Sequence, residues 1–257
     1  MEPIIECKDI EFSYNHAQVL NGISISINKG DMIGVLGANG AGKSTLLKII
    51  TGILEPKSGN IRFKGEKLLT RNKREIAKII AYIPQDQVFA FPFTVTEVIL
   101  LGRAPYIGRF EFERDIDRDI CSRAMETVGI SHLQHKLITA ISAGERQLVS
   151  LARALVQQPE VMILDEPATF LDVKNKTSLM KILSKLKIEN GITIIAATHD
   201  IFSALWHFDN IKVLKDGNIY AEGKTEDVIT SDILSHVYDI NVTVKKENGK
   251  LFVFPED

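Results

Sequence analysis

The stretch MIGVLGANGAGKST, from Met32 to Thr45, decides the fold. MIGVL is a short apolar run typical of a buried strand, and GANGAGKST fits the pattern G-x-x-x-x-G-K-[ST]. We expect a strand, a glycine-rich turn and then a helix that starts at Lys43 and runs toward Gly52, a stop signal. That order of elements is the context in which the pattern marks a phosphate-binding P-loop.

A P-loop binds phosphates because its backbone amides and the following helix N-terminus point partial positive charge at one place. Lys43 is expected to reach the β- and γ-phosphates of a nucleotide, and Ser44 to hold Mg²⁺. The residues expected to contact the nucleotide in this loop are Gly37, Asn39, Gly40, Ala41, Gly42, Lys43, Ser44 and Thr45.

Two further apolar runs end in polar residues of the kind that such a site needs. VMILDEP places Asp165 where it can bind the metal and Glu166 where it can polarise a water for attack on the γ-phosphate. AATHD places His199 at the exit of another buried strand, and a γ-phosphate contact is the preferred interpretation beside the other two strand ends. Taken alone, the two adjacent carboxylates of Asp165 and Glu166 have a simpler explanation, which is solvation of the end of a strand. Parallel α/β sheets bind ligands at the carboxyl ends of their strands.

Strand-like and helical stretches alternate along the chain, which favours an α/β architecture with a mostly parallel sheet. In GISISI, three isoleucines alternate with serines, as in a half-exposed strand. From about Gln87 to Gln158 helical periodicity dominates. We therefore expect one domain, with an α/β core over 1–86 and 159–220, an inserted helical subdomain over 87–158 and a short C-terminal extension over 221–257. The extension is expected to hold two short helices and a final β pair.

Composition excludes several classes of protein. The chain has 257 residues and a formal net charge of −2, so there is no basic excess of the kind that nucleic-acid binding uses. Cys7 and Cys121 lie far apart, match no metal-ligand spacing and are expected to be reduced thiols. The sequence shows no signal peptide and no apolar run near the ~20 residues that cross a bilayer. We expect a soluble chain that reaches a membrane only through another protein.

A second helix start occurs in ISAGERQLVSLARAL, which begins at Ile141. Ser142 and Glu145 satisfy S-x-x-E, so a capping box is a complete local explanation. Gly144 leaves backbone amides uncovered by a side chain, which suggests a second anion site instead. The residues of this stretch alone leave both interpretations open.

ISAGERQ resembles the signature sequence of the ATP-binding cassette (ABC) family, and it stands between the P-loop and the Asp-Glu strand as it does in that family. Gln85 in YIPQDQ is similar to the family's glutamine loop, and Asp172 at the end of FLD to its aspartate loop. His199 matches the switch histidine, and Tyr14 in FSY matches the aromatic that stacks on adenine. The resemblance covers essentially all 257 residues and rests on six motifs in order.

The resemblance implies a P-loop NTPase core with an N-terminal antiparallel β portion, an inserted helical subdomain, and ATP and Mg²⁺ as cofactors. It implies a head-to-tail homodimer in which each ATP is sandwiched between the P-loop of one copy and the signature of the other. The roles that it implies are catalysis by Glu166, His199, Lys43 and Gln85; metal binding by Ser44, Gln85 and Asp165; and nucleotide contact by the P-loop residues and by Tyr14, Ser142, Gly144, Glu145 and Asp172.

The sequence departs from the family pattern in two places. Ala143 stands where the first glycine of the signature is usual, and we expect it to be helical, since a left-handed alanine would cost about 1 kcal/mol or more. After Pro167, the common Thr-Ser-Ala is Ala168-Thr169-Phe170, a change expected to affect communication across the dimer while leaving Asp172 in place.

A single cassette that is not fused to membrane helices resembles the ATPase subunit of a bacterial importer. The resemblance implies that the chain docks on two transmembrane permease subunits at the cytoplasmic side of the cell (inner) membrane. It also implies an indirect partner, a substrate-binding protein that delivers the substrate to the permease. The GR-x-P-Y element from Gly102 to Tyr106 resembles subunits that import metal chelates: iron-siderophore, haem or cobalamin. A purely local explanation is that Gly102 ends a helix and Pro105 prevents its continuation. Gln85 and the stretch Thr94–Phe110 form the expected coupling face.

Other functions stay open at this point. An importer of another substrate, such as an oxyanion or a metal ion, would use the same engine. A soluble ABC ATPase that acts on nucleic acid is a remote alternative, and a P-loop small-molecule kinase would leave the signature, Gln85 and His199 unexplained.

Overall fold

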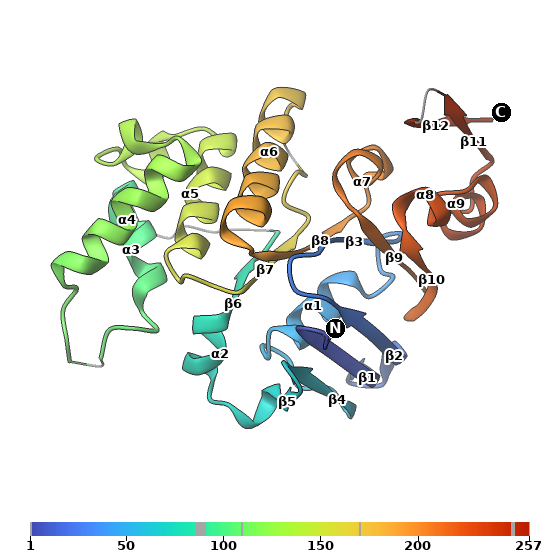
Figure 1. The fold of residues 1–257 in the computed structure, drawn as a ribbon, viewed down its shortest axis with the longest axis horizontal. Coiled ribbons are helices and arrows are strands. Elements are labelled where there is room, and N and C mark those ends of the chain that lie inside the picture. The colour runs from blue at the N-terminus through green and yellow to red at the C-terminus, as the bar shows by residue number, and fades with distance from the viewer. Residues whose placement is uncertain (1, 86–90, 109, 170, 248–249, 257) are drawn as a thin grey trace. The chain divides into compact units, whose positions relative to one another are not determined.

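The computed structural model describes residues 2–85, 91–108, 110–169, 171–247 and 250–256 (Figure 1). The chain divides into two compact units. The first combines Met1–Thr70 with Thr193–Asp257, and the second is Arg71–Ile192. We describe each unit by itself.

The first unit contains an antiparallel sheet with the strand order β2-β1-β4-β5. Its strands are β1 (Ile5–Tyr14), β2 (Ala17–Ile27), β4 (Ser58–Phe63) and β5 (Glu66–Lys67), followed by the 3₁₀ turn η1 (Leu68–Thr70). Buried isoleucines at 23, 25 and 27 alternate with exposed serines in β2. This confirms the expected half-exposed strand, because successive side chains of a strand point to opposite faces.

The first unit also contains four strands in the order β10-β9-β3-β8. Strand β3 (Met32–Leu36) is parallel to both β8 (Thr193–Thr198) and β9 (Asn210–Lys215), and β10 (Asn218–Lys224) returns antiparallel through the Asp216-Gly217 turn. All residues of β3 and β8 are buried, as expected of central parallel strands. Helices α1 (Lys43–Ile50) and α7 (Ile201–His207) follow β3 and β8.

The C-terminal part of the first unit agrees with the expectation of two short helices and a β pair. It contains α8 (Thr225–Val228), α9 (Ser231–Tyr238) and the antiparallel strands β11 (Val242–Glu247) and β12 (Lys250–Pro255).

The second unit holds two parallel strands and most of the helices. Strand β6 (Ile80–Ile83) pairs in register with β7 (Val161–Asp165), so that Ile83 lies opposite Leu164. Around them lie α2 (Lys73–Ile79), α3 (Val95–Leu100), α4 (Asp115–Val128), α5 (Ala143–Leu155) and α6 (Val173–Asn190), with the 3₁₀ turns η2 (Leu101–Arg103), η3 (Ser131–Leu133) and η4 (Ile138–Ala140).

Between β6 and β7 the described residues contain helices and turns and no strand, as the periodicity predicts. Helices α3 and α4 both pack against α5, which places these three side by side (Figure 1). The core of this helical part is apolar and includes Val95, Val98, Met125 and Val149. The α/β fold class is thus confirmed, with parallel strands, antiparallel strands and several helices; the boundaries proposed for the helical subdomain stay a prediction.

Two smaller expectations concern cysteines and membranes. Both cysteines are buried and neither is in a disulfide, in agreement with the predicted free thiols. In the part of the chain that the structure describes, none of the helices has the length and hydrophobicity needed to span a bilayer.

Candidate active site

The P-loop connects β3 to α1 as predicted, and glycine is needed at both of its ends. Gly37 has φ 156°, and a Cβ there would overlap the Leu214 carbonyl oxygen of β9. Gly42 has φ 103°, in the left-handed region that favours glycine, and a Cβ there would lie 2.7 Å from Leu20 Cδ2. The loop therefore follows a path that side chains at these two positions would block.

Lys43 and the N-terminus of helix α1 supply the positive charge of the loop. Lys43 is 5% exposed, and its Nζ donates to the carbonyl oxygens of Gly37 (2.8 Å) and Ala38 (3.0 Å). Helix α1 has Gly42 as its N-cap, with no side-chain cap and no acidic residue in the first turn. A helix N-terminus of this kind carries positive partial charge that no nearby carboxylate offsets. The arrangement fits an anion such as a nucleotide phosphate.

His199 lies at the same edge of the sheet as the P-loop. Leu36, the last residue of β3, pairs with Thr198, the last residue of β8. Gly37 and His199 are the next residues along the chain, so both segments leave the sheet side by side. The histidine is exposed there. Register in the parallel sheet thus brings together two of the predicted groups.

The second unit brings together Gln85, Asp165 and Glu166. Asp165 at the end of β7 is 3% exposed and accepts a hydrogen bond from Tyr82 Oη (3.0 Å) on the neighbouring strand β6. Glu166 Oε2 accepts from Gln85 Nε2 (3.3 Å) and from Thr169 Oγ1 (3.0 Å). The Glu166 carboxylate is thereby held in one orientation, which a group that positions a water requires.

Tyr82 was not singled out in the sequence, and Thr169 was noted only as part of the altered Ala168-Thr169-Phe170 segment. Glu166 has a backbone conformation that was not expected. Its φ of 48° is left-handed, a conformation rare for residues other than glycine. Such residues cost about 1–3 kcal/mol and occur often at functional sites. No local pattern in LDEP signals this conformation.

Helix α5 starts with the expected capping box. Ser142 Oγ accepts from the Glu145 N–H (3.2 Å), and Glu145 Oε2 accepts from the Ser142 N–H (2.7 Å) and from Ser142 Oγ (2.7 Å). The backbone N–H and then the hydroxyl of Ser142 hold the pKa of Glu145 below its usual value. Ala143 is the first residue of the helix and is not among the residues with positive φ, so its expected helical conformation is confirmed.

Gly144 is buried, which differs from the open amide that its sequence suggests. A Cβ at Gly144 would lie 2.8 Å from Asn175 Nδ2 of α6. Asn175 also donates from its backbone N–H to Asp172 Oδ1 (2.7 Å) and from Nδ2 to Asp172 Oδ2 (3.2 Å). The structure thus joins the signature and the aspartate loop through Asn175, a residue that sequence reasoning missed.

The remaining predicted residues are placed as follows. Tyr14 at the end of β1 is 48% exposed, and its ring meets that of Phe12 edge-on at 4.8 Å, so one side of the ring is available for stacking. Phe170 of the altered Ala-Thr-Phe segment and Arg109 of the coupling stretch lie outside the described residues.

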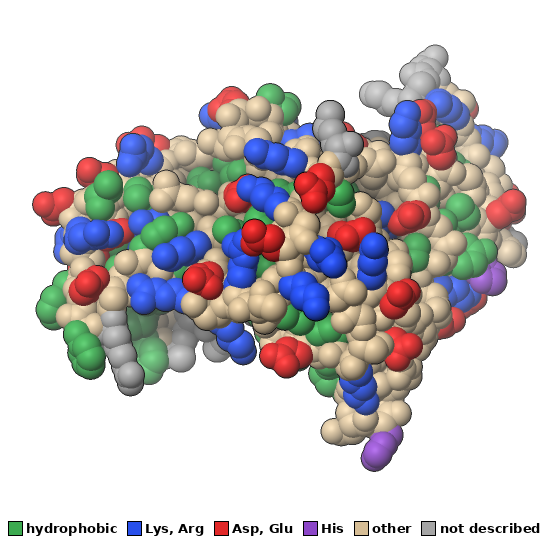
Figure 2. All heavy atoms as spheres, turned by 60° about the horizontal axis from the view of Figure 1, so that its bottom comes forward, with side chains coloured by type: hydrophobic (Ala, Val, Ile, Leu, Met, Phe, Trp, Pro, Cys, Tyr) green, Lys and Arg blue, Asp and Glu red, His purple; other side chains and the backbone are tan. Residues whose placement is uncertain are grey.

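Part of the stretch Thr94–Phe110 is buried, so only its exposed residues can belong to the predicted coupling face. Val95, Val98, Gly102 and Arg103 are buried. Exposed apolar side chains remain around the buried part, and they are Phe91, Phe93, Leu101, Phe110, Phe112 and Ile116. Figure 2 shows hydrophobic side chains at the lower left of the view, on the surface of the helical part.

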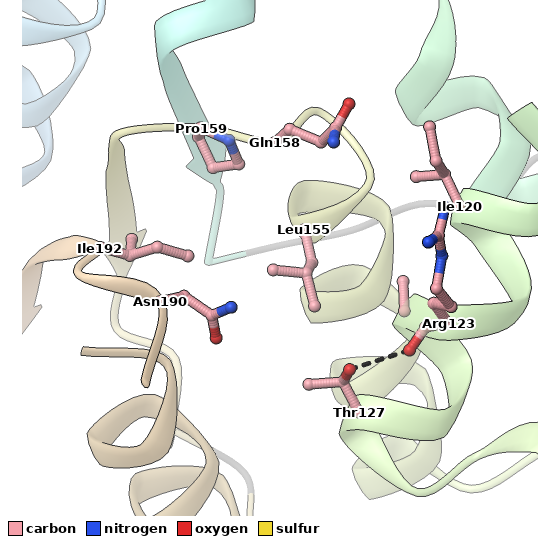
Figure 3. Close-up of a pocket in the computed structure, with 9 residues that line it drawn as sticks. Ile120, Arg123, Thr127, Leu155, Gln158, Pro159, Asn190 and Ile192 are labelled. Atoms are coloured by element: carbon pink, nitrogen blue, oxygen red, sulfur yellow. Dashed lines mark hydrogen bonds between the residues drawn. The ribbon is translucent and has the colours of Figure 1, made fainter. Parts of the chain in front are cut away.

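A pocket of about 390 Å³ lies in the second unit, away from the motifs described above. Leu155, Gln158 and Pro159 line it from the end of α5 and the start of the segment to β7 (Figure 3). The other lining residues come from α4, from the end of α6 and from Ile192, two residues after α6. Pro159 precedes β7, whereas Asp165 ends that strand. The pocket is therefore at the opposite end of β7 from the predicted catalytic carboxylates.

The donor set fits Mg²⁺ bound through few protein ligands. Among the described residues, no group of three or more His, Cys, Asp or Glu side chains is arranged to hold a metal ion. Mg²⁺ usually takes one or two protein ligands together with phosphate oxygens and waters. A serine hydroxyl after the P-loop lysine and a carboxylate at a strand end are ligands of that kind.

Comparison with known proteins places these elements in a family. The family profile of the ABC transporter matches residues 20–169. The ABC transporter ATP-binding protein MJ0089 of Methanocaldococcus jannaschii is 37% identical over 252 residues, which are 98% of each chain. The cobalamin import ATP-binding protein BtuD of Halobacterium salinarum is 35% identical over 88% of this chain, and this chain spans only 56% of its length. The ferric enterobactin transport ATP-binding protein FepC of Escherichia coli is 29% identical over 92% of this chain and 88% of its own.

Two solved structures are similar over most of the chain. One is an inward-facing ABC transporter described as of metal-chelate type, with a TM-score of 0.87, 25% identity and coverage of 99% of this chain and 98% of the other. The other is the dimeric cassette MJ0796, with a TM-score of 0.75, 27% identity and coverage of 86% and 98%. Together with the P-loop, the Asp-Glu strand end and the capped signature helix, these findings show that the chain belongs to the ABC transporter family and is one of its ATP-binding cassette ATPases.

Proposed function

We propose that the chain is the ATP-hydrolysing subunit of an importer for a metal chelate: an iron-siderophore, haem or cobalamin. The observation that carries the substrate class is the similarity, over nearly the whole chain, to a transporter described as of metal-chelate type. The import proteins for cobalamin and ferric enterobactin among its relatives support the same class.

In this proposal the first unit binds the nucleotide. Gly37 to Thr45 would hold the phosphates, because Lys43 and the uncapped start of α1 supply positive charge in a loop that glycines keep open. The exposed ring of Tyr14 would stack on the adenine. When bound, ATP supplies the phosphoryl group that is transferred to water, and Mg²⁺ withdraws charge from it. Ser44, Asp165 and Gln85 would hold the ion.

Glu166 would act as the base that orients and polarises the attacking water. The hydrogen bonds from Gln85 and Thr169 fix its carboxylate, and its backbone is left-handed. His199, at the same sheet edge as the P-loop, would contact the γ-phosphate. These roles need no covalent intermediate, because positioning and electrostatic stabilisation account for most of the catalysis of phosphoryl transfer.

Two copies would assemble head to tail, with the start of α5 in one copy closing over the nucleotide of the other. Ser142, Gly144, Glu145 and, through Asn175, Asp172 form one connected group that suits this role. ATP would then hold the dimer closed, and its hydrolysis would release it, which shifts the population between two states.

The exposed apolar side chains around α3, from Phe91 to Ile116, would receive the permease subunits. Contiguous exposed apolar surface is typical of an interaction site. The chain would thereby be a peripheral protein at the cytoplasmic face of the cell membrane.

Uptake in cells tests the substrate class. Radiolabelled cobalamin, haem and a ferric siderophore are offered to cells with the intact chain, with Glu166→Gln and without the chain. We expect uptake of one of the three to need the intact chain. If uptake of all three is unchanged while that of an oxyanion or a free metal ion is lost, the substrate class is wrong but the importer function stands.

A further inference from the structure

The GR-x-P-Y element makes contacts that its resemblance to metal-chelate importers does not explain. We call Gly102, Arg103 and Tyr106 the clamp. Arg103 Nη1 donates to the Val156 carbonyl oxygen (2.7 Å), and Tyr106 Oη donates to that of Gln157 (2.8 Å). These two residues directly follow α5, where carbonyl groups lack partners within the helix. The clamp therefore caps the C-terminal end of the helix whose N-terminal end carries the signature.

The clamp is built closely around its arginine. Arg103 is 3% exposed, its Nε lies 2.9 Å from Asp117 Oδ1 at the start of α4, and its guanidinium stacks 3.9 Å from the centre of the Tyr106 ring. Burial alone would raise the pKa of Asp117, but the Arg114 backbone N–H and Arg103 outweigh it and hold that pKa below its usual value. Lysine has no planar fork with which to make these contacts together.

Glycine is required at the first clamp position for a reason of packing. A Cβ at Gly102 would overlap the Arg153 carbonyl oxygen of α5 and would lie 2.5 Å from Val156 Cγ2. Gly102 is in the 3₁₀ turn η2 and has no positive φ. The backbone of η2 thus lies directly against the last turn of α5.

The end of α5 depends on its contact with the clamp, because another side of this helix end faces a pocket. Leu155 and Gln158 line the pocket of about 390 Å³, across from residues of α4 and α6 (Figure 3). The side that faces the pocket lacks the packing that fixes a helix in a close-packed interior. Gln158 Oε1 also accepts from Arg103 Nη1 (3.2 Å), so the clamp reaches the rim of the pocket.

Exposed apolar residues flank the clamp on both sides along the chain. Leu101 directly precedes Gly102 and is 57% exposed, and Phe110 follows four residues after Tyr106 and is 93% exposed. The exposed Arg74 of α2 donates hydrogen bonds to the carbonyl oxygens of Pro105 (2.7 Å) and Ile107 (2.8 Å) in the same segment. The segment between Leu101 and Ile107 is thus fastened on one side to α2 and on the other to α5.

We propose that the clamp is a positioning device that makes the permease-facing segment and the signature helix move as one body. A force on the exposed side chains would pass through Arg103 and Tyr106 to the end of α5, and this helix, about 20 Å long, would carry it to Ser142. The inference rests on the proposed function, because it takes the permease surface and the role of Ser142 from it.

The test uses the double variant Arg103→Lys/Tyr106→Phe in the complex of the chain with the permease subunits that co-purify with it. The variant keeps a positive charge for Asp117 and an aromatic ring, but loses the bonds to the carbonyls after α5. We expect permease-stimulated ATP hydrolysis and chelate transport to fall by about tenfold, within the usual range of coupling between sites. The basal ATPase rate of the free chain and its KM for ATP stay within about twofold.

Thr127→Val is the matched control. It removes a hydroxyl that donates to a helix carbonyl, that of Arg123, on α4 at the same pocket, but it leaves the clamp intact. We expect its stimulated and basal rates to equal those of the wild type. Thermal unfolding of each variant reports whether the fold is retained, and Tyr106→Phe alone provides a milder second variant.

Equal losses of basal and stimulated rate would overturn the inference, since they indicate a purely structural role. Unchanged rates in the double variant would also overturn it. A wild-type chain whose ATPase no permease stimulates would instead contradict the proposed function itself, and that result appears before any variant is compared.

Discussion

Two helices in this chain begin at predicted phosphate sites, and they begin in opposite ways. Helix α1 starts at Gly42, with no side-chain cap and no acidic residue in its first turn. Helix α5 starts at Ser142 with a complete capping box, and Glu145 places a carboxylate in its first turn. The first start carries no acidic side chain, whereas the second satisfies part of its own N–H groups with a serine hydroxyl and places a carboxylate beside them.

The difference teaches which helix start can bind an anion alone. The positive end of α1 is reinforced by Lys43. The positive end of α5 is offset by the charge of Glu145, whose pKa is lowered by the Ser142 backbone N–H and hydroxyl, so this carboxyl stays ionised. In our account α1 therefore binds the nucleotide by itself, and α5 contributes only when a second copy presents a nucleotide that is already held.

The largest expected effect comes from Glu166→Gln, which stops the reaction without touching either helix start. Turnover should fall by about 10²–10⁴-fold, because the amide cannot accept a proton from the attacking water. ATP affinity should stay near that of the wild type. Steady-state hydrolysis and equilibrium binding of a fluorescent ATP analogue measure the two quantities, and a near-normal hydrolysis rate would remove Glu166 from its proposed role.

Lys43→Met should separate the two helix starts in binding. Loss of a charged hydrogen-bond donor should weaken ATP binding by about 1.5–3 kcal/mol, roughly 10- to 150-fold. Ser142→Ala should leave ATP binding to the single chain unchanged. Titration calorimetry at a concentration where the chain is monomeric compares the variants; an equal loss in both would mean that α5 acts on the nucleotide of its own chain.

Gly144→Ala tests whether Asn175 packs over the start of α5 as described. The added methyl group would meet Asn175 Nδ2 at 2.8 Å, and overpacking of this kind costs about 1–3 kcal/mol. Urea unfolding should show that loss of unfolding free energy when Gly144→Ala is introduced into the wild type. When Gly144→Ala is introduced into a chain that already carries Asn175→Ala, the loss should be smaller. If the background makes no difference, the contact has been misplaced.

The smallest effect concerns the capping box and its pH dependence. Ser142→Ala should lower the free energy of unfolding by about 1 kcal/mol at neutral pH. The pKa of Glu145 is lower in the folded chain, so its contribution is present above its usual pKa near 4.5 and is lost as pH falls through the folded value. The difference in unfolding free energy between wild type and Ser142→Ala should therefore shrink as pH falls below that usual pKa, because the variant lacks the hydroxyl bond to the ionised Glu145 but keeps the backbone one. A constant difference down to pH 3 would contradict the role of Glu145.

The comparison also explains what the sequence could predict. The P-loop and the capping box follow from residues close together in the chain, and both appear as expected. The Asp216-Gly217 hairpin is equally local. Their geometry is set by local backbone preferences and local hydrogen bonds, which a short stretch of sequence contains.

What the sequence could not predict depends on contacts between distant residues. In the sequence Arg103 belongs to a motif expected at the surface, yet it is buried, because Asp117 and the residue after α5 accept hydrogen bonds from its Nε and Nη1. Gly144 reads as an open amide, yet Asn175 from another helix covers it. The left-handed backbone of Glu166 arises from the surroundings of β7 and has no signal in LDEP. Tertiary packing decides these features, so only a three-dimensional structure reveals them.

The most direct test of shared sites mixes two disabled copies that carry different tags. Both carry Glu166→Gln; one also carries Lys43→Met, and the other Ser142→Arg. Only a mixed pair can place an intact α1 start opposite an intact α5 start, so ATP-dependent crosslinking should capture mixed pairs and neither variant with itself. Crosslinking that is absent from the mixture, or equally strong in the Ser142→Arg copy alone, would contradict the claim that α5 serves the nucleotide of a second copy.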